Sequence, residues 1–130
     1  MATRSTIGML LEDGETIRSV YCHWDGYPEG VGAMLKNHYT DPTKIEQLLD
    51  HGDISSLQET IGEQHPFEDS GSDETTFYGR DRGETGINAL THADENEWLG
   101  FRKGSWCEYG YLWKDGEWHT FKITPEYANA

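Results

Sequence analysis

A cysteine and a histidine stand side by side at positions 22 and 23, and they are the residue types of a thiol nucleophile and its base. Such a pair works only when the two side chains reach each other. The surrounding pattern predicts a strand, in which neighbouring side chains point to opposite faces. A Cys22 nucleophile would therefore need another histidine as its base, and we expect Cys22 and Cys107 to be buried free thiols.

A second candidate site combines glycines, arginines and aromatic rings. The glycine-rich segment 26–32 precedes a predicted helix, whose first N–H groups could bind an anion. Arg80 and Arg82 are spaced to fork a carboxylate or phosphate, although we favour internal salt bridges with neighbouring acids. Cys22 or His23 would act if a bound nucleotide were hydrolysed. The candidate ligand-binding residues are His23, Trp24, Tyr27, Arg80 and Arg82.

A third candidate site is defined by charge. The 130 residues include 24 Asp and Glu against 10 Lys and Arg, a net charge of -14. The segment 59–97 holds eleven of the acids and only two arginines. It is either a solvated region that aids solubility, or a surface that docks on a basic groove and imitates a phosphate array. The candidate partner-binding residues are Glu59, Glu63, Glu68, Asp69, Asp73, Glu74, Asp94, Glu95 and Glu97.

The same charge disfavours several partners. Nucleic acid and anionic membranes would repel the chain on average. No apolar run approaches the roughly 20 residues that cross a bilayer, and the first residues lack the apolar stretch of a signal peptide, so we expect an intracellular protein. Two cysteines and six scattered histidines match no metal motif. We expect neither a metal nor a cofactor.

Two β-hairpins are predicted to begin and end the domain. Alternating apolar residues over 7–11 and an extended run over 17–24 flank Asp13-Gly14, and strands over 106–113 and 118–123 flank Asp115-Gly116. Asp-Gly between such runs favours a hairpin, because the turn needs a residue that tolerates a positive φ. The aromatic residues of the last strands exceed what one sheet face needs, which indicates either a two-sided sheet or a protein-binding face.

Helices are predicted in the first half of the chain. One covers 30–39, and a second follows the cap Asp41-Pro42 and ends at His51-Gly52. A short strand over 75–78, a turn over 80–84 and a short helix over 91–99 complete the pattern. The order predicts one α+β domain over 1–130. We expect a mostly antiparallel sheet with two β-hairpins, two to three short helices on one face, and an acidic loop-rich segment at 59–97.

Several stretches are distinctive as motifs: Thr3-Arg4-Ser5-x-Ile7, YCHWDGYPEGVG over 21–32, His38-Tyr39, Lys44 and GDISSL over 52–57. In these stretches, and in RDRG over 80–83 and DGEW over 115–118, the chain resembles a family of small accessory proteins of tailed bacteriophages. The resemblance implies a phage product that acts in the host bacterial cytoplasm. It brings no assigned catalytic residue.

These observations give a first hypothesis for function. We expect a non-enzymatic inhibitor that binds a host protein with a basic surface, such as a CRISPR nuclease or a restriction enzyme, with nucleic-acid mimicry as one means. The alternative is a nucleotide or small-molecule binder that sequesters or hydrolyses a defence signal. A minor structural phage protein is a further alternative.

Overall fold

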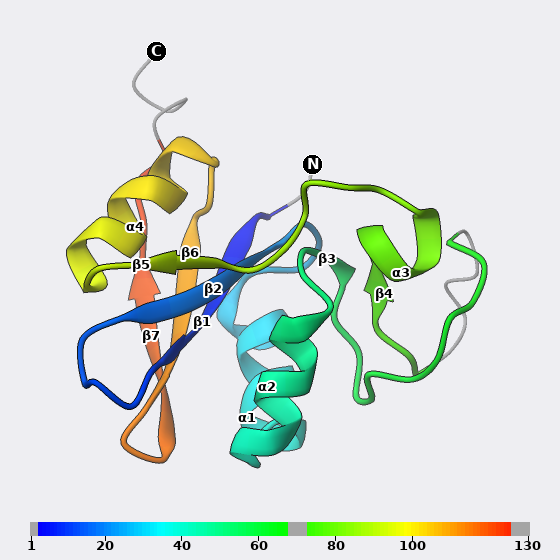
Figure 1. Ribbon diagram of the computed structural model, residues 1–130, viewed down its shortest axis with the longest axis horizontal. Coiled ribbons are helices and arrows are strands. Elements are labelled where there is room, and N and C mark those ends of the chain that lie inside the picture. Colours follow the sequence, from blue (N-terminus) through cyan, green and yellow to red (C-terminus); the bar gives the residue numbers. More distant parts are fainter. Residues whose placement is uncertain (1–2, 68–72, 126–130) are drawn as a thin grey trace.

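The computed structural model describes residues 3–67 and 73–125. Its strands are β1 Ser5–Leu10, β2 Ile17–Cys22, β3 Ile54–Ser56, β4 Thr76–Phe77, β5 Leu90–His92, β6 Tyr109–Lys114 and β7 Glu117–Lys122. Its helices are the π-helical turn η1 Pro28–Gly32, α1 Ala33–His38, α2 Pro42–Asp50, α3 Tyr78–Arg82 and α4 Glu95–Gly104. The domain is of the α+β class, as the sequence predicts (Figure 1).

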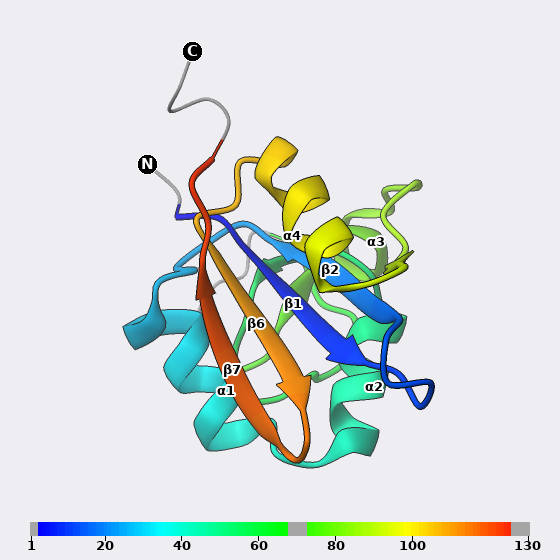
Figure 2. The same ribbon diagram turned by 90° about the vertical axis from the view of Figure 1, so that its left-hand side faces the viewer.

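The seven strands form one mixed sheet. Six follow the order β4-β3-β2-β1-β6-β7, and β5 pairs with β2. The pairs β1–β6 and β2–β3 are parallel, so the expectation of a mostly antiparallel sheet is corrected to a mixed one. Figure 2 shows β1 and β6 side by side in the centre of the sheet. Hairpin motifs in the sequence predict only antiparallel pairs between strands that follow each other. The β1–β6 pair joins Ser5 to Tyr109, which are far apart in the sequence.

Both predicted hairpins are confirmed. β1 pairs with β2 from Ser5↔Cys22 to Leu10↔Ile17, and β6 pairs with β7 antiparallel as well. Asp115 and Gly116 have φ of 55° and 79°, the two positive values of a type I′ turn. The pairing of β6 begins at Tyr109 rather than at 106, so Cys107 precedes the strand in which it was predicted.

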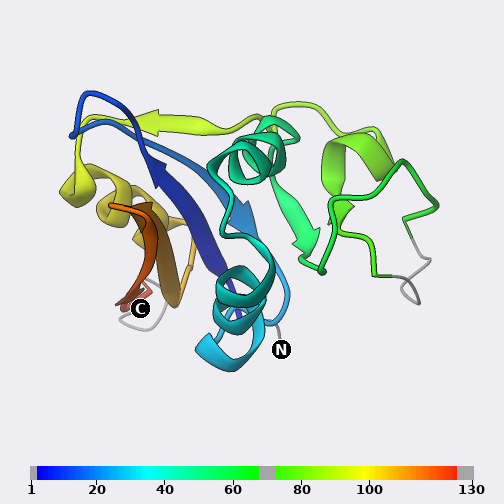
Figure 3. The same cartoon turned by 90° about the horizontal axis from the view of Figure 1, so that it is seen from below.

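The helices lie on both faces of the sheet, which corrects the expectation of one helical face. Ile7 of β1 packs in the cluster formed with α1 and α2, whereas Gly8 faces the Trp98 ring of α4. Trp98 is fully buried, and its indole N–H donates to Thr6 Oγ1 at 3.1 Å. Figures 1 and 3 show α4 apart from α1 and α2. Aromatic residues of the last strands therefore pack on both faces of the sheet, Tyr111 on one side and Phe121 on the other, whereas Trp106 is 48% exposed.

The helix predicted to start at Asp41-Pro42 is confirmed. The Asp41 carboxylate accepts a hydrogen bond from the Thr43 N–H at 2.9 Å, and the three apolar positions Ile45, Leu48 and Leu49 are fully buried. The helix predicted over 30–39 is divided into η1 and α1.

Two other predictions are wrong in type or extent. The segment 80–84 belongs in part to α3 instead of a turn, and the helix predicted over 91–99 is α4, which starts at Glu95 and ends at Gly104.

The acidic segment after β3 is folded onto itself. Thr60 and Glu74 form a β-bridge, and the Arg80 guanidinium donates to the carbonyls of Ile61, Gly62 and Thr75 at 2.8–3.0 Å. We call residues 59–67 and 73–84 the acidic lobe. Figures 1 and 3 place this lobe at the opposite end of the molecule from α4.

Candidate functional site

The parallel strands β2 and β3 end at the same edge of the sheet, and the chain leaves β2 in an anchored turn there. The Trp24 N–H donates to the Ser55 carbonyl at 3.0 Å, and the Gly26 N–H donates to the Thr3 carbonyl at 2.8 Å. These bonds fix the backbone without using the side chains. The residues that follow β2 are therefore presented at this edge on a rigid support.

The turn continues into η1 through an unusual backbone. Asp25 has φ of 57°, and its carbonyl accepts a hydrogen bond from the Val31 N–H at 2.8 Å. Gly30 passes so close that a Cβ there would lie 2.3 Å from the Asp25 oxygen, so only glycine fits. Left-handed non-glycine residues and π-helical turns are both frequent at functional sites. This turn is the first indication of one.

Two adjoining hollows lie beside this turn. One has a volume of about 240 Å³ and is lined by Asp25, Glu29, Met34, Asn37, His38 and Gln58, among others. The other has a volume of about 420 Å³ and is lined by Trp24, Asp25, Ser55, Ser56, Gln58, Phe67 and Thr76. Asp25 and Gln58 line both. We call the two together the strand-end groove.

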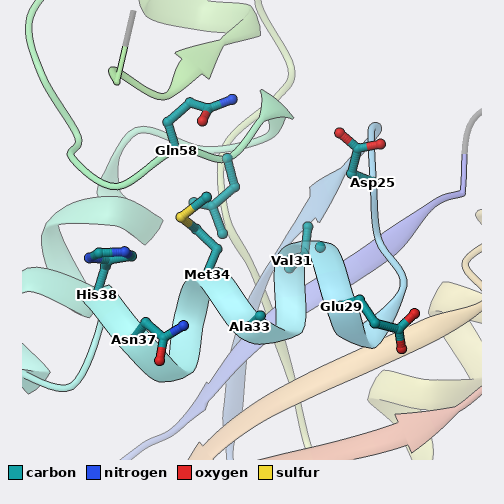
Figure 4. A pocket seen from close by; sticks show the side chains of 10 residues that line it. Asp25, Glu29, Val31, Ala33, Met34, Asn37, His38 and Gln58 are labelled. Atoms are coloured by element: carbon teal, nitrogen blue, oxygen red, sulfur yellow. The ribbon is translucent and has the colours of Figure 1, made fainter.

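The first hollow has an acidic end and a polar end. In Figure 4, Asp25 and Glu29 lie at one end and Asn37 and His38 at the other, with Met34 pointing up between them toward Gln58. Beyond it, the Glu59 carboxylate lies 3.7 Å from His38 Nε2. Among the described residues that line the two hollows, two are carboxylates and none is Lys or Arg. The groove thus favours a cationic occupant.

Exposed aromatic rings accompany these acids. The Trp24 side chain is 46% exposed and Tyr27 is 38% exposed, although large rings are usually covered. The His23 ring packs against Trp24 nearly perpendicularly, with centroids 4.8 Å apart, and His23 Nδ1 lies 2.7 Å from the Tyr21 hydroxyl. Burial, helped by the nearby Arg4, lowers the pKa of His23, so its ring is neutral at pH 7. Trp24 is therefore held against a neutral support.

The two cysteines are buried free thiols, as predicted. Burial raises the pKa of Cys22 and of Cys107 to about 12, so neither is a thiolate nucleophile at neutral pH. The Cys22 Sγ points to the Trp24 carbonyl at 3.8 Å, whereas His23 contacts Tyr21. The neighbouring Cys22 and His23 thus diverge, as expected for a strand.

Arg80 and Arg82 do not form a clamp. The Arg80 guanidinium is held by backbone carbonyls and by Asp81, at 3.0 Å from Arg80 Nε. Arg82 is paired with Glu84 at 2.7 Å and lies over the Phe67 ring. Both arginines form the internal ion pairs that we favoured from the sequence.

The glycine-rich segment also lacks an anion site. The N–H groups of Gly26, Gly30, Val31 and Gly32 all donate to backbone carbonyls. Of the five candidate ligand residues, the structure brings His23 and Trp24 together at the groove and leaves Tyr27 on the same turn. It does not bring the two arginines and the glycine N–H groups together around a phosphate.

The candidate partner-binding acids do not form one surface. Glu59, Glu63, Asp73 and Glu74 belong to the acidic lobe, whereas Asp94, Glu95 and Glu97 lie at the start of α4 at the other end. Asp94 is the N-cap of α4, and its carboxylate accepts from the Glu97 N–H at 2.9 Å. Glu68 and Asp69 lie outside the described residues.

Sequence reasoning found Trp24 and Tyr27 but missed the acids beside them. Asp25 and Glu29 are not among the candidate residues, and Met34 falls within the helix predicted over 30–39. The run Trp-Asp-Gly-Tyr-Pro-Glu-Gly carried a usable signal, since it alternates large rings with carboxylates inside a segment too rich in Gly and Pro to bury them. Phe67 is separated from this run in sequence and could not have been assigned to it.

No helix in the described part of the chain is both long and apolar enough to cross a bilayer. Within residues 3–67 and 73–125, no three His, Cys, Asp or Glu side chains are grouped as metal ligands. Comparison with models of known protein families, with curated proteins and with solved structures finds no match.

Proposed function

We propose that this protein is a small non-enzymatic inhibitor that binds a host protein through a basic surface of that protein. The observation that carries the proposal is the strand-end groove, which Trp24, Asp25 and Glu29 line, with the exposed Tyr27 on the same turn. Aromatic residues supply anchoring energy at interfaces, and charge complementarity speeds association and selects the partner.

The proposed partner is a host defence or nucleic-acid-handling protein, such as a CRISPR nuclease or restriction enzyme, in the bacterial cytoplasm. Such proteins carry basic channels for nucleic acid, which a chain of net charge -14 would approach favourably. Since the acids are divided between two ends of the molecule, we base the proposal on the groove and the adjoining acidic lobe. Binding through this surface does not require the acids to form an extended array that imitates the phosphates of nucleic acid.

The test is capture of the partner with two charge-matched variants. The variant Glu29→Lys/Glu59→Lys changes exposed acids at the groove, and Glu15→Lys/Glu95→Lys changes acids beside the first hairpin and α4. Each variant brings the net charge from -14 to -10, because each Glu→Lys adds two units. Immobilised proteins are incubated with bacterial lysate at about 50 and 300 mM salt, which changes the screening length severalfold. Captured proteins are identified by mass spectrometry.

We expect the wild type and the Glu15/Glu95 variant to capture the same protein at low salt, and the groove variant to lose it. Capture should weaken at the higher salt, and the purified partner's nuclease or nucleic-acid-binding activity should fall when wild-type protein is added. Equal capture by the two variants would show that the groove is not the binding surface. Capture without inhibition would remove the inhibitory role.

A further inference from the structure

The larger hollow of the groove combines features that suit one particular side chain. We propose, building on the function proposed above, that this hollow seats an arginine of the partner, with its guanidinium stacked on Trp24 and paired with the Asp25 carboxylate.

The walls of the hollow favour a flat cation. Trp24 and Phe67 both line it, and Trp24 keeps 46% of its surface exposed. A guanidinium is planar and stacks on aromatic faces, and tryptophan is the ring that attracts cations most strongly. Phe67 already receives one guanidinium, since Arg82 Cζ lies 4.9 Å from its centroid. The ammonium of lysine is more strongly hydrated and does not stack in this way.

The polar groups of the hollow match the donors of arginine. Asp25 is exposed and takes part in no ion pair among the described residues, and its carboxylate accepts only a long hydrogen bond of 3.4 Å from the Tyr27 hydroxyl. Ser56 and Gln58 add oxygen atoms that can accept further hydrogen bonds. A guanidinium carries five N–H donors and no acceptor, so this set of groups serves it well.

The surroundings disfavour an anionic occupant. Arg82, whose guanidinium lies over the Phe67 ring, is neutralised by Glu84 at 2.7 Å. The neighbouring hollow adds Glu29, with Glu59 beyond it. Electrostatic complementarity therefore selects a cation over a phosphate at this end of the groove.

The experiment follows the indole N–H signals of the isotope-labelled full chain during titration with four probes. These are the N-acetyl amides of arginine, lysine and citrulline, and adenosine; citrulline is the neutral isostere of arginine. Trp24→Phe assigns the Trp24 signal. We expect arginine to move this signal saturably, with a dissociation constant at least about fivefold below that of lysine. Citrulline and adenosine should leave it in place.

Asp25→Asn tests the carboxylate, with Asp115→Asn as its matched control. The two aspartates have nearly the same backbone, with φ of 57° and 55°, and asparagine tolerates that conformation equally well. Asp115 lies in the β6–β7 turn, outside both hollows. We expect Asp25→Asn to weaken arginine binding about tenfold and Asp115→Asn to leave it unchanged.

An equal response to citrulline, a response to adenosine alone, no response to any probe, or no effect of Asp25→Asn would each overturn the arginine site. Such a result would not decide the function proposed above, because the capture experiment tests that function without changing Asp25. Conversely, arginine binding with the expected pattern supports the site even where the Glu29/Glu59 variant still captures the partner.

Discussion

Arg80 holds the acidic lobe together through a single side chain. Its guanidinium binds three backbone carbonyls and the buried carboxylate of Asp81. Burial by itself would raise the pKa of Asp81, but hydrogen bonds from Arg80 and from the N–H groups of Phe77 and His65 lower it below its usual range. Asp81 is therefore ionised in the folded protein, and it forms an ion pair with Arg80.

Arg80→Met should lower the free energy of unfolding by about 3 kcal/mol, since it leaves the buried carboxylate of Asp81 without the guanidinium that neutralises it. Arg82→Met is the control, because the Arg82–Glu84 pair is half exposed, with the Arg82 side chain at 53%, and such pairs contribute about 1 kcal/mol or less. Urea unfolding of both variants measures the difference. Equal losses would mean that Arg80 is no more than a surface residue.

At the scale of elements, the backbone is packed most closely at the junction between α2 and β3. Gly52 has φ of 80°, and a Cβ there would lie 2.2 Å from the Ile87 carbonyl oxygen. That oxygen also accepts a hydrogen bond from the Asp53 N–H at 2.8 Å. The backbone at Ile87 therefore packs against the end of α2 and holds the chain in place just before β3.

Gly52→Ala should destabilise the protein by about 3 kcal/mol, through the left-handed backbone and the clash together. Gly14→Ala separates the two effects, because Gly14 has φ of 74° but nothing within 4 Å of the added carbon. That control should lose about 1 kcal/mol. Thermal or urea unfolding gives both values, and similar losses would contradict the proposed contact.

Elements whose signals are local could be predicted from the sequence. The Asp-Gly turns gave both hairpins, and the Asp41-Pro42 cap with Gly52 gave α2 at nearly its observed bounds. The parallel pairs β1–β6 and β2–β3 could not be predicted, because no local pattern encodes which distant strands become neighbours. For the same reason, the sequence did not predict that helices cover both faces of the sheet. At the site, Trp24 was found as an aromatic residue, but its neighbour Phe67 comes from another part of the chain.

At the scale of the whole molecule, three histidines are kept neutral by burial. Burial lowers the pKa of His23, His51 and His92, with the nearby arginines Arg4, Arg80 and Arg102, respectively, adding to the effect. His92 Nε2 lies 2.8 Å from Ser19 Oγ, which also accepts a hydrogen bond from the buried Arg102. Opposing contributions from Glu97, Asp50 and Asp81 are smaller.

Stability should therefore fall as the pH falls from 7.5 to 5.5. As the pH falls, the histidines of the unfolded chain bind protons near their ordinary pKa of about 6.5, whereas those of the folded protein bind them only at a lower pH. The stabilisation from the neutral histidines is therefore complete above about pH 6.5 and is lost below it. The free energy of unfolding cannot change by more than about 1.4 kcal/mol per pH unit for each histidine. Urea unfolding at several pH values measures it.

His92→Gln is the control for this pH dependence, since glutamine retains a polar group but does not titrate. Its slope between pH 7.5 and 5.5 should be smaller than that of the wild type. A flat wild-type profile, or an unchanged slope in the variant, would mean that buried histidines do not govern acid sensitivity.

The central position of β1 has a consequence for synthesis of the chain. Its parallel neighbour β6 begins at Tyr109, so the first strand leaves the ribosome roughly 5 to 20 s before that neighbour, at rates of about 5–20 residues per second. During that interval one edge of β1, whose residues Ser5–Leu10 carry no charge, has no native partner. The segment 59–97, with its eleven acids, emerges in the same interval and makes the nascent chain strongly negative. We expect this like charge to oppose association of partly synthesised chains through the unpaired edge of β1.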